Sequence, residues 1–288
     1  MDGLYIGTCS WKYPSWEGLV YSRPRGIDYL EEYARHYNSV EIDQWFWSLF
    51  RGDQVKLPDP ALVEAYSRVV PEDFRFSVKV PNSITLTHHY KGAGGAPLQA
   101  NPHFLSVEVF ADFLERLVPF GGKLGPLIFQ FEYLNRRKMS GPQEFIERFE
   151  AFTAGLPEGL SCAVEIRNKN YLTEEYFRFL ANAGLVPVFI SGYYMPPPVP
   201  VYQRFRHLIR ERAVLRLLGS DREGIEEKAG KSWNRVVRPM DDELKQVAGM
   251  IRSLRRDRVV SFVNVNNHYE GSAPLTIRRL QSLLQGPE

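Results

Sequence analysis

A chain of 288 residues, 44% of them hydrophobic and 24% charged, has the composition of an ordinary globular protein. It contains no apolar run of about 18 residues, so we expect no membrane span. It also lacks a basic-then-apolar leader, so we expect a cytoplasmic protein. The formal net charge of only +2 excludes a strongly basic or acidic polyelectrolyte. Residues 201–258 nevertheless carry an excess of lysine and arginine, which argues weakly for nucleic acid as a partner.

The first half of the chain alternates short apolar segments with longer segments of helical period. The pattern predicts strands over residues 5–10, 39–43, 74–80 and 127–131. Helices are predicted over residues 28–37, from Pro58 or Pro60 to residue 69, over residues 104–118 and over residues 143–154. A long loop over residues 81–102 separates the third strand from the helix that follows it.

The second half continues this alternation with one exception. Strands are predicted over residues 162–168, 185–190, 213–217 and 259–264. Helices are predicted from Thr173, whose hydroxyl can cap the first turn, and over residues 241–254 and 274–284. Residues 195–200 contain four prolines, and we expect them to form a loop that replaces or interrupts the sixth helix.

Eight strands that alternate with helices indicate parallel strands joined by helical crossovers. The number and spacing favour an α/β fold in which residues 1–288 form a single (β/α)8 TIM-type barrel domain. An open doubly wound sheet is the alternative, but no glycine-rich phosphate loop follows the first strand. The two cysteines, Cys9 and Cys162, lack a CxxC partner, so no structural zinc site is predicted.

Polar residues gather at the carboxyl ends of six predicted strands whose other positions are apolar. They are Glu41, Lys79, Gln130, Glu165 with Arg167, Arg216, and Asn264 with Asn266. In a (β/α)8 barrel these strand ends meet at one mouth, which is where such barrels place their active sites. Burying charges there is costly unless they are paired or used, so we interpret the group as a ligand site.

The charges in this group favour an anionic ligand. Lys79, Arg167 and Arg216 are predicted to bind a phosphate or carboxylate, which arginine can hold with two hydrogen bonds. Glu165 and Glu41 are the candidate catalytic residues, acting as general acid or base, or else the partners that hold the cations in place.

The neutral residues of the group favour orientation and stacking of a substrate. Gln130, Asn264 and Asn266 can each donate and accept hydrogen bonds at fixed geometry. Trp11 and Trp47 follow the first two strands and can stack on a sugar or a base, or simply pack.

A metal site is not predicted. Glu41 and Glu165 are able to ligate a divalent ion, but no predicted strand end supplies a histidine. His88 and His89 are adjacent in a loop, and the nearby cations oppose a bound metal. We therefore expect neither a metal nor another cofactor.

Several segments together resemble the YecE-like family, a domain of unknown function numbered seventy-two. They are residues 6–11 with Trp16, and residues 40–42, 74–79, 125–130, 164–167, 215–217, 266–267, 270–271 and 273–274. The resemblance covers nearly the whole chain, and it implies a TIM-type barrel with a polar site at its mouth. It implies no particular reaction.

The chain also departs from the pattern of that family at several positions. Leu218 stands where the family usually has a histidine two residues after the arginine of the seventh strand, and His268 stands where it usually has an aspartate. Residues 43–47 and 132–133 differ as well. If the usual histidine is catalytic, this chain has lost or altered that chemistry.

We therefore hypothesise an enzyme, a hydrolase or lyase without a required metal, that binds an anionic or sugar-containing small molecule at the barrel mouth. One alternative is a nucleic-acid phosphodiesterase or endonuclease, which rests on fold analogy. The other is a non-catalytic ligand-binding or sensor protein. A glycosidase would need Glu41 and Glu165 at a set separation across the cleaved bond.

Overall fold

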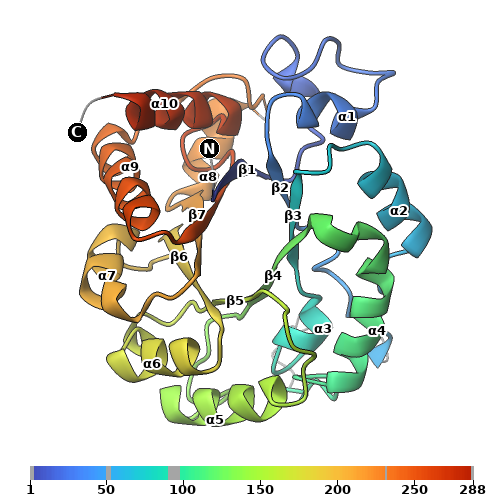
Figure 1. The fold of residues 1–288 in the computed structure, drawn as a ribbon, viewed down its shortest axis with the longest axis vertical. Coiled ribbons are helices and arrows are strands. Elements are labelled where there is room, and N and C mark those ends of the chain that lie inside the picture. Colours follow the sequence, from blue (N-terminus) through green and yellow to red (C-terminus); the bar gives the residue numbers. More distant parts are fainter. Residues whose placement is uncertain (1–2, 50–52, 90–97, 231, 287–288) are drawn as a thin grey trace.

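The computed structural model describes residues 3–49, 53–89, 98–230 and 232–286. Within these ranges, parallel strands form one closed barrel in the order of the sequence, from β1 to β8 (Figure 1). Strand β1 pairs with both β2 and β8, and this pairing closes the barrel. The predicted (β/α)8 TIM-type barrel is confirmed.

The strands lie close to where the apolar segments of the sequence predict them. They are β1 (Leu4–Cys9), β2 (Ser39–Ile42), β3 (Arg75–Lys79), β4 (Leu124–Gln130), β5 (Cys162–Glu165), β6 (Val186–Gly192), β7 (Arg212–Gly219) and β8 (Val260–Val265). The predicted fifth strand is too long, because the chain leaves the sheet after Glu165 and residues 169–171 form a turn of 3₁₀ helix.

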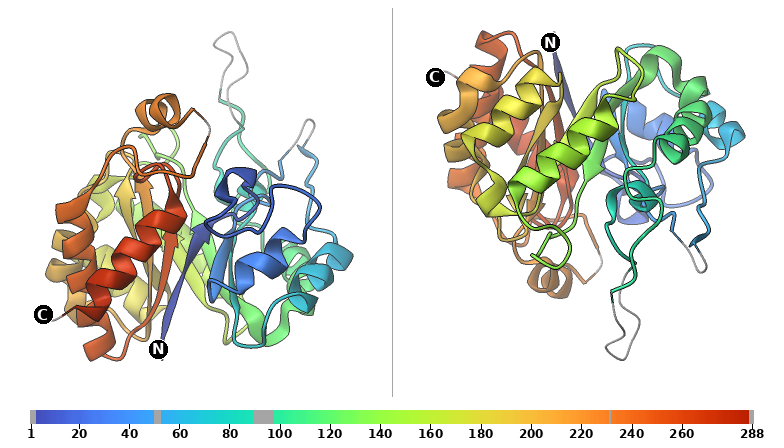
Figure 2. Two further views of the ribbon diagram at one scale, coloured as in Figure 1. Left: turned by 90° about the horizontal axis from the view of Figure 1, so that it is seen from above. Right: turned by 90° about the horizontal axis from the view of Figure 1, so that it is seen from below.

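Most helices surround the barrel and run along its outer face, whereas the short helix at residues 222–229 lies over one end of it (Figures 1 and 2). The helices are α1 (Tyr29–Ala34), α2 (Pro60–Arg68), α3 (Asn82–Thr85), α4 (Val107–Leu117), α5 (Pro142–Thr153), α6 (Glu174–Asn182), α7 (Pro198–Phe205), α8 (Arg222–Ala229), α9 (Asp241–Arg256) and α10 (Ala273–Gln285). Side chains of Asp28, Asp59, Ser106 and Thr173 accept hydrogen bonds from backbone N–H groups in the first turns of α1, α2, α4 and α6.

The prediction of a proline-rich loop in place of the sixth helix was wrong. Helix α7 begins at Pro198 and includes Pro200 in its first turn. Proline is tolerated there because the first backbone N–H groups of a helix have no intrahelical acceptor, and its fixed φ suits the helix. The prolines therefore start a helix, and only the residues before Pro198 connect it to β6.

The polar segment before α9 also contains a helix that the sequence pattern missed. In α8 only Ile225 and Ala229 are buried, so the segment has almost no apolar face from which a helix could be predicted. None of the helices in the described part of the chain combines the length and apolarity needed to span a bilayer.

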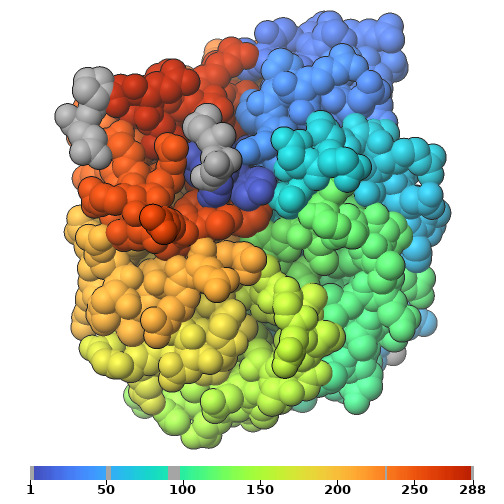
Figure 3. All heavy atoms as spheres, viewed as in Figure 1, coloured from blue at the N-terminus to red at the C-terminus, as the bar shows by residue number. Residues whose placement is uncertain are grey.

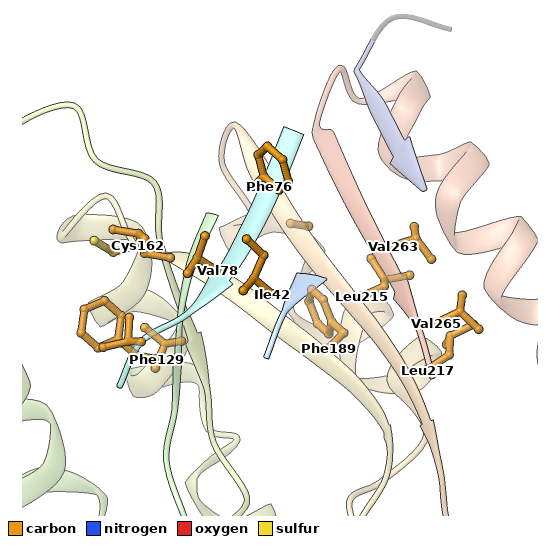
Figure 4. Close-up of a cluster of buried hydrophobic side chains, with 14 of the residues drawn as sticks. Ile42, Phe76, Val78, Phe129, Cys162, Phe189, Leu215, Leu217, Val263 and Val265 are labelled. Carbon is orange, nitrogen blue, oxygen red and sulfur yellow. The ribbon is translucent and has the colours of Figure 1, made fainter. Parts of the chain in front are cut away.

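The core has two layers separated by the barrel wall. Outward-facing strand residues such as Phe129, Leu215 and Val263 pack with side chains of the surrounding helices (Figure 4). In the space-filling view the colours follow one another around the molecule from blue through green and yellow to red, as expected for units that succeed one another around a barrel (Figure 3). A smaller cluster fills the barrel interior, where the ring of Tyr5 stacks on that of Phe262 with centroids 4.7 Å apart.

The alternation of side chains along each strand sets the position of the polar site. The interior cluster includes Ile128, Ala163, Val214 and Phe262. Two residues further along the same strands lie Gln130, Glu165, Arg216 and Asn264, which therefore face the same interior, closer to the carboxyl ends of the strands. The start of β1 and the end of α10 lie at the opposite end of the barrel (Figure 2).

Candidate functional site

The guanidinium of Arg216 on β7 is the centre of a buried charged cluster. Its Nε and Nη2 donate to the two carboxylate oxygens of Glu41 on β2, at 2.7 and 2.5 Å. Its Nη1 donates to Glu165 on β5 and, at 3.1 Å, to Oε1 of Gln130 on β4. Arg216 thus joins the ends of three strands that lie far apart in the sequence.

Glu165 is shared by two arginines. Its Oε2 accepts from Arg216, and its Oε1 accepts from Nε of Arg167 at 3.0 Å and forms an ion pair with Nη2 of Arg167, also at 3.0 Å. Burial alone would raise the pKa of Glu165, but the Arg216 and Arg167 guanidiniums outweigh it and hold the pKa below its usual value. The same pairing with Glu165 and Glu41 raises the pKa of Arg216 against the opposing effect of burial. Glu165 is therefore held as an ionised, fully paired carboxylate.

Lys79, at the end of β3, lies beside this cluster without joining it. Its side chain is only 8% exposed, and its Nζ lies 3.9 Å from the centroid of the Phe46 ring. Among the residues that the structure describes, none gives Lys79 a hydrogen bond or an ion pair. Burial is the main cause that lowers its pKa, to about 8, and Arg216 acts in the same direction against the nearby carboxylates.

Asp43 is a member of the site that sequence reasoning missed. It lies two residues beyond Glu41 and is half-buried. Burial first, and then the charge of Glu41, raise the pKa of Asp43. The two-residue spacing that drew attention to Glu165 and Arg167 was the available signal here too, because it places Asp43 and Glu41 on one side of the chain.

A cavity of about 580 Å³ opens beside the charged cluster. Its lining residues are Phe46, Leu86, Gln130, Glu132, Tyr133, Arg167, Lys169, Tyr193 and Tyr194. Arg167 connects the cavity to the cluster, because it pairs with Glu165 and its guanidinium carbon lies 3.9 Å from the centroid of the Tyr193 ring. The cavity therefore combines positive charge with aromatic surface.

Two tyrosines of the cavity have an unusual backbone. Tyr193 and Tyr194 both adopt left-handed conformations, with φ of 52° and 61°, directly after β6. Such conformations are costly for bulky residues and concentrate at functional sites. Tyr194 is 96% exposed, so burial of its ring does not offset that cost. Neither tyrosine was predicted, because nothing in the local sequence marks a left-handed pair.

The two predicted tryptophans do not line this cavity. Trp11 is buried and packs edge-on against Tyr66, with ring centroids 5.1 Å apart, in a separate depression beside α1 and α2. Trp47 is 62% exposed and packs edge-on against Phe46. Through this contact Trp47 touches a residue of the cavity lining.

The two predicted asparagines differ from each other. Asn264 is fully buried next to Arg216 in the register of β7 and β8, and neither of its amide atoms has a partner within the described ranges. Asn266 instead organises the next loop, since its Oδ1 accepts from the backbone N–H of His268 and lies 2.6 Å from the Nδ1 atom of that ring. The other ring nitrogen of His268 lies 2.8 Å from Glu226.

Potential metal ligands do not cluster in the described part of the chain. No group of three or more histidine, cysteine, aspartate or glutamate side chains there is placed to hold a metal ion. Outside the cluster, Nε2 of His89 lies 2.8 Å from a carboxylate oxygen of Asp53, and Nδ1 of His88 lies 3.0 Å from the hydroxyl of Thr87.

Comparison with known proteins identifies the family. The model of the protein family of unknown function DUF72 matches residues 5–288. The chain belongs to the DUF72 family. A curated relative, UPF0759 protein YecE of Escherichia coli strain K12, is 30% identical over 182 residues, which are 63% of this chain and 55% of that protein. The match thus spans about half the length of that relative.

Solved structures of DUF72 proteins share the fold. One from Enterococcus faecalis V583 is 18% identical with a TM-score of 0.70, covering 99% of this chain and 96% of the other. One from Thermotoga maritima MSB8 is 21% identical with a TM-score of 0.65, covering 98% of this chain and 99% of the other. At these identities the similarity establishes the barrel and carries no information on the reaction.

Leu218 has an apolar setting in this DUF72 protein. Leu218 lies two residues beyond Arg216 and is buried against Cys9 and Ile190, with Met195 packed alongside. The side chains around Leu218 are therefore apolar.

Proposed function

We propose that this protein is an enzyme that binds a small, anionic, ring-containing molecule in the cavity at the barrel mouth. The observation that carries the proposal is the position of Arg167. It is anchored by Glu165 in the buried cluster, stacked on Tyr193, and part of the cavity lining. A guanidinium that is oriented on one side and open to a cavity on the other is suited to recognise a phosphate or carboxylate.

The arginines of the cluster have different roles in this proposal. Arg216 is committed to Glu41 and Glu165, so it positions these carboxylates rather than the ligand. Arg167 turns only Nε and Nη2 toward Glu165, which leaves its Nη1 for a ligand oxygen. Lys169 adds a second positive charge to the cavity wall.

The aromatic residues of the cavity favour a ligand with a flat or apolar face. Phe46, Tyr133, Tyr193 and Tyr194 line it, and rings of this kind stack on sugars and planar groups while phenolic hydroxyls supply hydrogen bonds. A cavity of about 580 Å³ has the size of a small-molecule site. A sugar or other ring that carries a phosphate or carboxylate fits both features.

For proton transfer, we favour Asp43 over the two glutamates that the sequence suggested, although Asp43 is not among the residues that line the cavity. A general acid or base has to exchange its proton near the working pH. Glu165 is held ionised by Arg167 and Arg216, and both carboxylate oxygens of Glu41 accept from Arg216. Asp43 has a raised pKa and no comparable partner among the described residues. We assign Asp43 the role of acid or base and the glutamates the role of positioning the arginines.

The first test measures binding. Glucose 6-phosphate and glucose differ by one phosphate, so their effects on the thermal unfolding temperature report on anion recognition. We expect glucose 6-phosphate to raise this temperature more than glucose, and Arg167→Gln to remove the difference. Arg178→Gln serves as the control, because Arg178 is exposed on α6 and pairs with Glu174 away from the cavity. Equal shifts with both sugars, or an unchanged shift in Arg167→Gln, would contradict the proposal.

The second test separates an enzyme from a sensor. Compounds that raise the unfolding temperature are incubated with wild-type protein and with Asp43→Asn, and the mixtures are analysed by mass spectrometry. Turnover by the wild type alone supports the enzyme. Recovery of every bound compound intact would support a ligand-binding protein instead.

No structural observation favours a nucleic-acid phosphodiesterase. The positive residues of the segment 201–258 include several that form exposed ion pairs and do not line the cavity. These pairs are Arg206 with Asp257, Arg222 with Glu226, and Arg238 with Asp221. That function stays a prediction from fold analogy.

A further inference from the structure

Two lysines of this chain are almost equally buried but differ in their surroundings. Lys123 is 7% exposed, and its Nζ donates to the carbonyl oxygens of Ser67 and Val70, at 2.8 and 3.0 Å, and pairs with Glu72 at 3.0 Å. This is the expected environment of a structural lysine, because a buried ammonium is costly unless its hydrogens are paired. Lys79 is 8% exposed and has no such partner among the described residues.

The pairing of Arg216 explains why Lys79 stays unpartnered. The carboxylates of Glu41 and Glu165 face Lys79, but their oxygens already accept from Arg216 and Arg167. Lys79 contacts the face of the Phe46 ring instead. The ionisable groups around it are Arg216 from β7, Glu165 from β5, Glu41 from β2, Asp43 directly after β2, and Cys9 from β1.

These surroundings favour the neutral amine. Burial removes water from the ammonium, and the neighbouring guanidinium of Arg216 repels it. Desolvation next to another cation is a known way in which proteins activate a lysine as a nucleophile. The carboxylates act in the opposite direction, yet the pKa of Lys79 falls to about 8. At pH 7 about a tenth of the Lys79 side chains are then unprotonated, compared with well under a thousandth for an ordinary lysine.

We propose that Lys79 is a nucleophile that forms an imine with a carbonyl group of the ligand. Lys79 is not among the residues that line the cavity, but Phe46 both contacts its Nζ and lines the cavity, so a ligand carbonyl would have to reach the amine past that ring. This inference rests on the proposed function and narrows its substrate class to an anionic aldehyde or ketone, with the anion on Arg167 and the carbonyl on Lys79.

The chemistry requires no co-reactant. The nitrogen lone pair of Lys79 attacks the carbonyl carbon, and a carbon–nitrogen bond forms as the carbonyl π electrons move to oxygen. One proton passes from nitrogen to that oxygen and gives a carbinolamine. The oxygen then leaves as water, taking a second proton from nitrogen, and the imine takes up a proton from solvent to become an iminium. We assign the transfer of these protons to Asp43, whose charge acts on Lys79.

The test traps this adduct on the unmodified wild-type chain. The protein is incubated with glyoxylate and sodium cyanoborohydride, which delivers hydride to the iminium carbon and leaves a stable secondary amine. Peptide mass mapping then locates the modified lysines. We expect Lys79 to react roughly tenfold or more faster than exposed Lys12 at neutral pH, because its lower pKa leaves more neutral amine, and Lys123 to stay unmodified. The Lys79 rate should rise with pH to a midpoint near 8.

A neutral probe separates this inference from the proposed function. With acetaldehyde in place of glyoxylate, Lys79 should still be modified faster than Lys12. The additional preference for glyoxylate should disappear in Arg167→Gln. A fast Lys79 with no preference for glyoxylate supports the nucleophile and overturns the anion site. A Lys79 that reacts with neither probe, or only as fast as Lys12, overturns the nucleophile even where glucose 6-phosphate still stabilises the protein.

Discussion

The guanidinium of Arg216 donates from all three of its nitrogens, and these hydrogen bonds occupy the carboxylates of Glu41 and Glu165. Glu41 and Glu165 become fixed carboxylates, and Lys79 is left without a carboxylate of its own. Pairing is thus distributed unequally within one buried cluster. Lys79 is the unpaired member, and it is the one that we propose to react. The pairing of Arg216 with Glu41 and Glu165 keeps Lys79 unpaired.

Replacing Arg216 should lower the stability of the protein, because two buried carboxylates lose the cation that they share. Arg216→Met leaves Glu41 and Glu165 buried without their shared partner, and we expect the free energy of unfolding to fall by about 3–5 kcal/mol. Urea unfolding followed by circular dichroism measures it. The matched control is Arg178→Met, which breaks an exposed pair with Glu174 and should cost only about 0.3–0.5 kcal/mol. A loss in Arg216→Met as small as in the control would show that the cluster is not structural.

Lys79→Met should stabilise the protein at neutral pH. The pKa of Lys79 falls from 10.5 to about 8 on folding, so a protonated Lys79 destabilises the folded state below pH 8. We expect the variant to gain about 2–3 kcal/mol there. Between pH 8 and 10.5 the unfolded wild type binds more protons than the folded one, so its stability rises with pH and the advantage of the variant disappears.

Lys123→Met is the control for that measurement. Lys123 is equally buried but fully paired, so its replacement leaves two carbonyl oxygens without a donor and should lower the stability. Unfolding curves of both variants at several pH values decide the question. A Lys79→Met variant that is less stable than wild type at pH 7 would show that Lys79 supports the fold.

At the scale of elements, the side chains of buried asparagines form hydrogen bonds with the backbone of the loops that follow the strands. The Oδ1 of Asn82 accepts from the backbone N–H groups of Ser48 and Leu49. Asn168 makes two bonds with the backbone of Leu134, accepting from its N–H at 2.8 Å and donating to its C=O at 2.9 Å. Without these hydrogen bonds the loops would hold the cavity residues less firmly, because loop backbone groups lack the regular partners that helices and sheets provide.

Asn168→Ala should affect both stability and binding. It leaves the N–H and C=O of buried Leu134 unpaired, so we expect a loss of about 1–3 kcal/mol in the free energy of unfolding. Tyr133 precedes Leu134 and lines the cavity, so the response to glucose 6-phosphate should weaken too. Asn170→Ala, at an exposed position two residues away, should change neither. Equal behaviour of the two variants would contradict the anchoring role.

At the scale of the whole molecule, closure of the barrel depends on a close approach between β1 and β2. A Cβ atom added to Gly7 would lie 1.8 Å from the carbonyl oxygen of Ser39. That distance is shorter than any non-bonded contact, and the atom in the way belongs to the backbone of the paired strand. Only glycine fits at position 7, so β1 can pair with β2 only when this residue is glycine.

Gly7→Ala should therefore prevent normal folding. We expect little soluble protein, or a strongly lowered unfolding temperature, because β1 has to move away from β2 and the barrel opens. Gly249→Ala on α9 is the opposite case, since nothing lies within 4 Å of the added Cβ, and alanine should stabilise that helix by up to about 1 kcal/mol. Soluble yield and thermal unfolding measure both. A Gly7→Ala protein with wild-type stability would refute the steric argument.

The barrel and the polar character of its mouth could both be predicted from the amino-acid sequence. Local apolar periodicity specifies where strands form, and the order of strands and helices specifies parallel pairing. Positions such as Glu165 and Arg216 are conspicuous because burying a charge at the end of an apolar strand costs desolvation free energy unless the charge is paired or binds a ligand. The same local reasoning failed at the prolines before and within α7, where the choice between loop and helix depends on position within the first turn.

Only the tertiary structure decided which charges pair and which stay unpaired. Arg216 and Glu41 are 175 positions apart in the chain, and no local pattern indicates that the arginine meets two glutamates while Lys79 meets an aromatic ring. The left-handed conformations of Tyr193 and Tyr194 likewise could not be predicted from the sequence, although both residues line the cavity. The physical reason is that periodicity specifies which face a side chain occupies, whereas partners and pKa values depend on distances set by closure of the barrel.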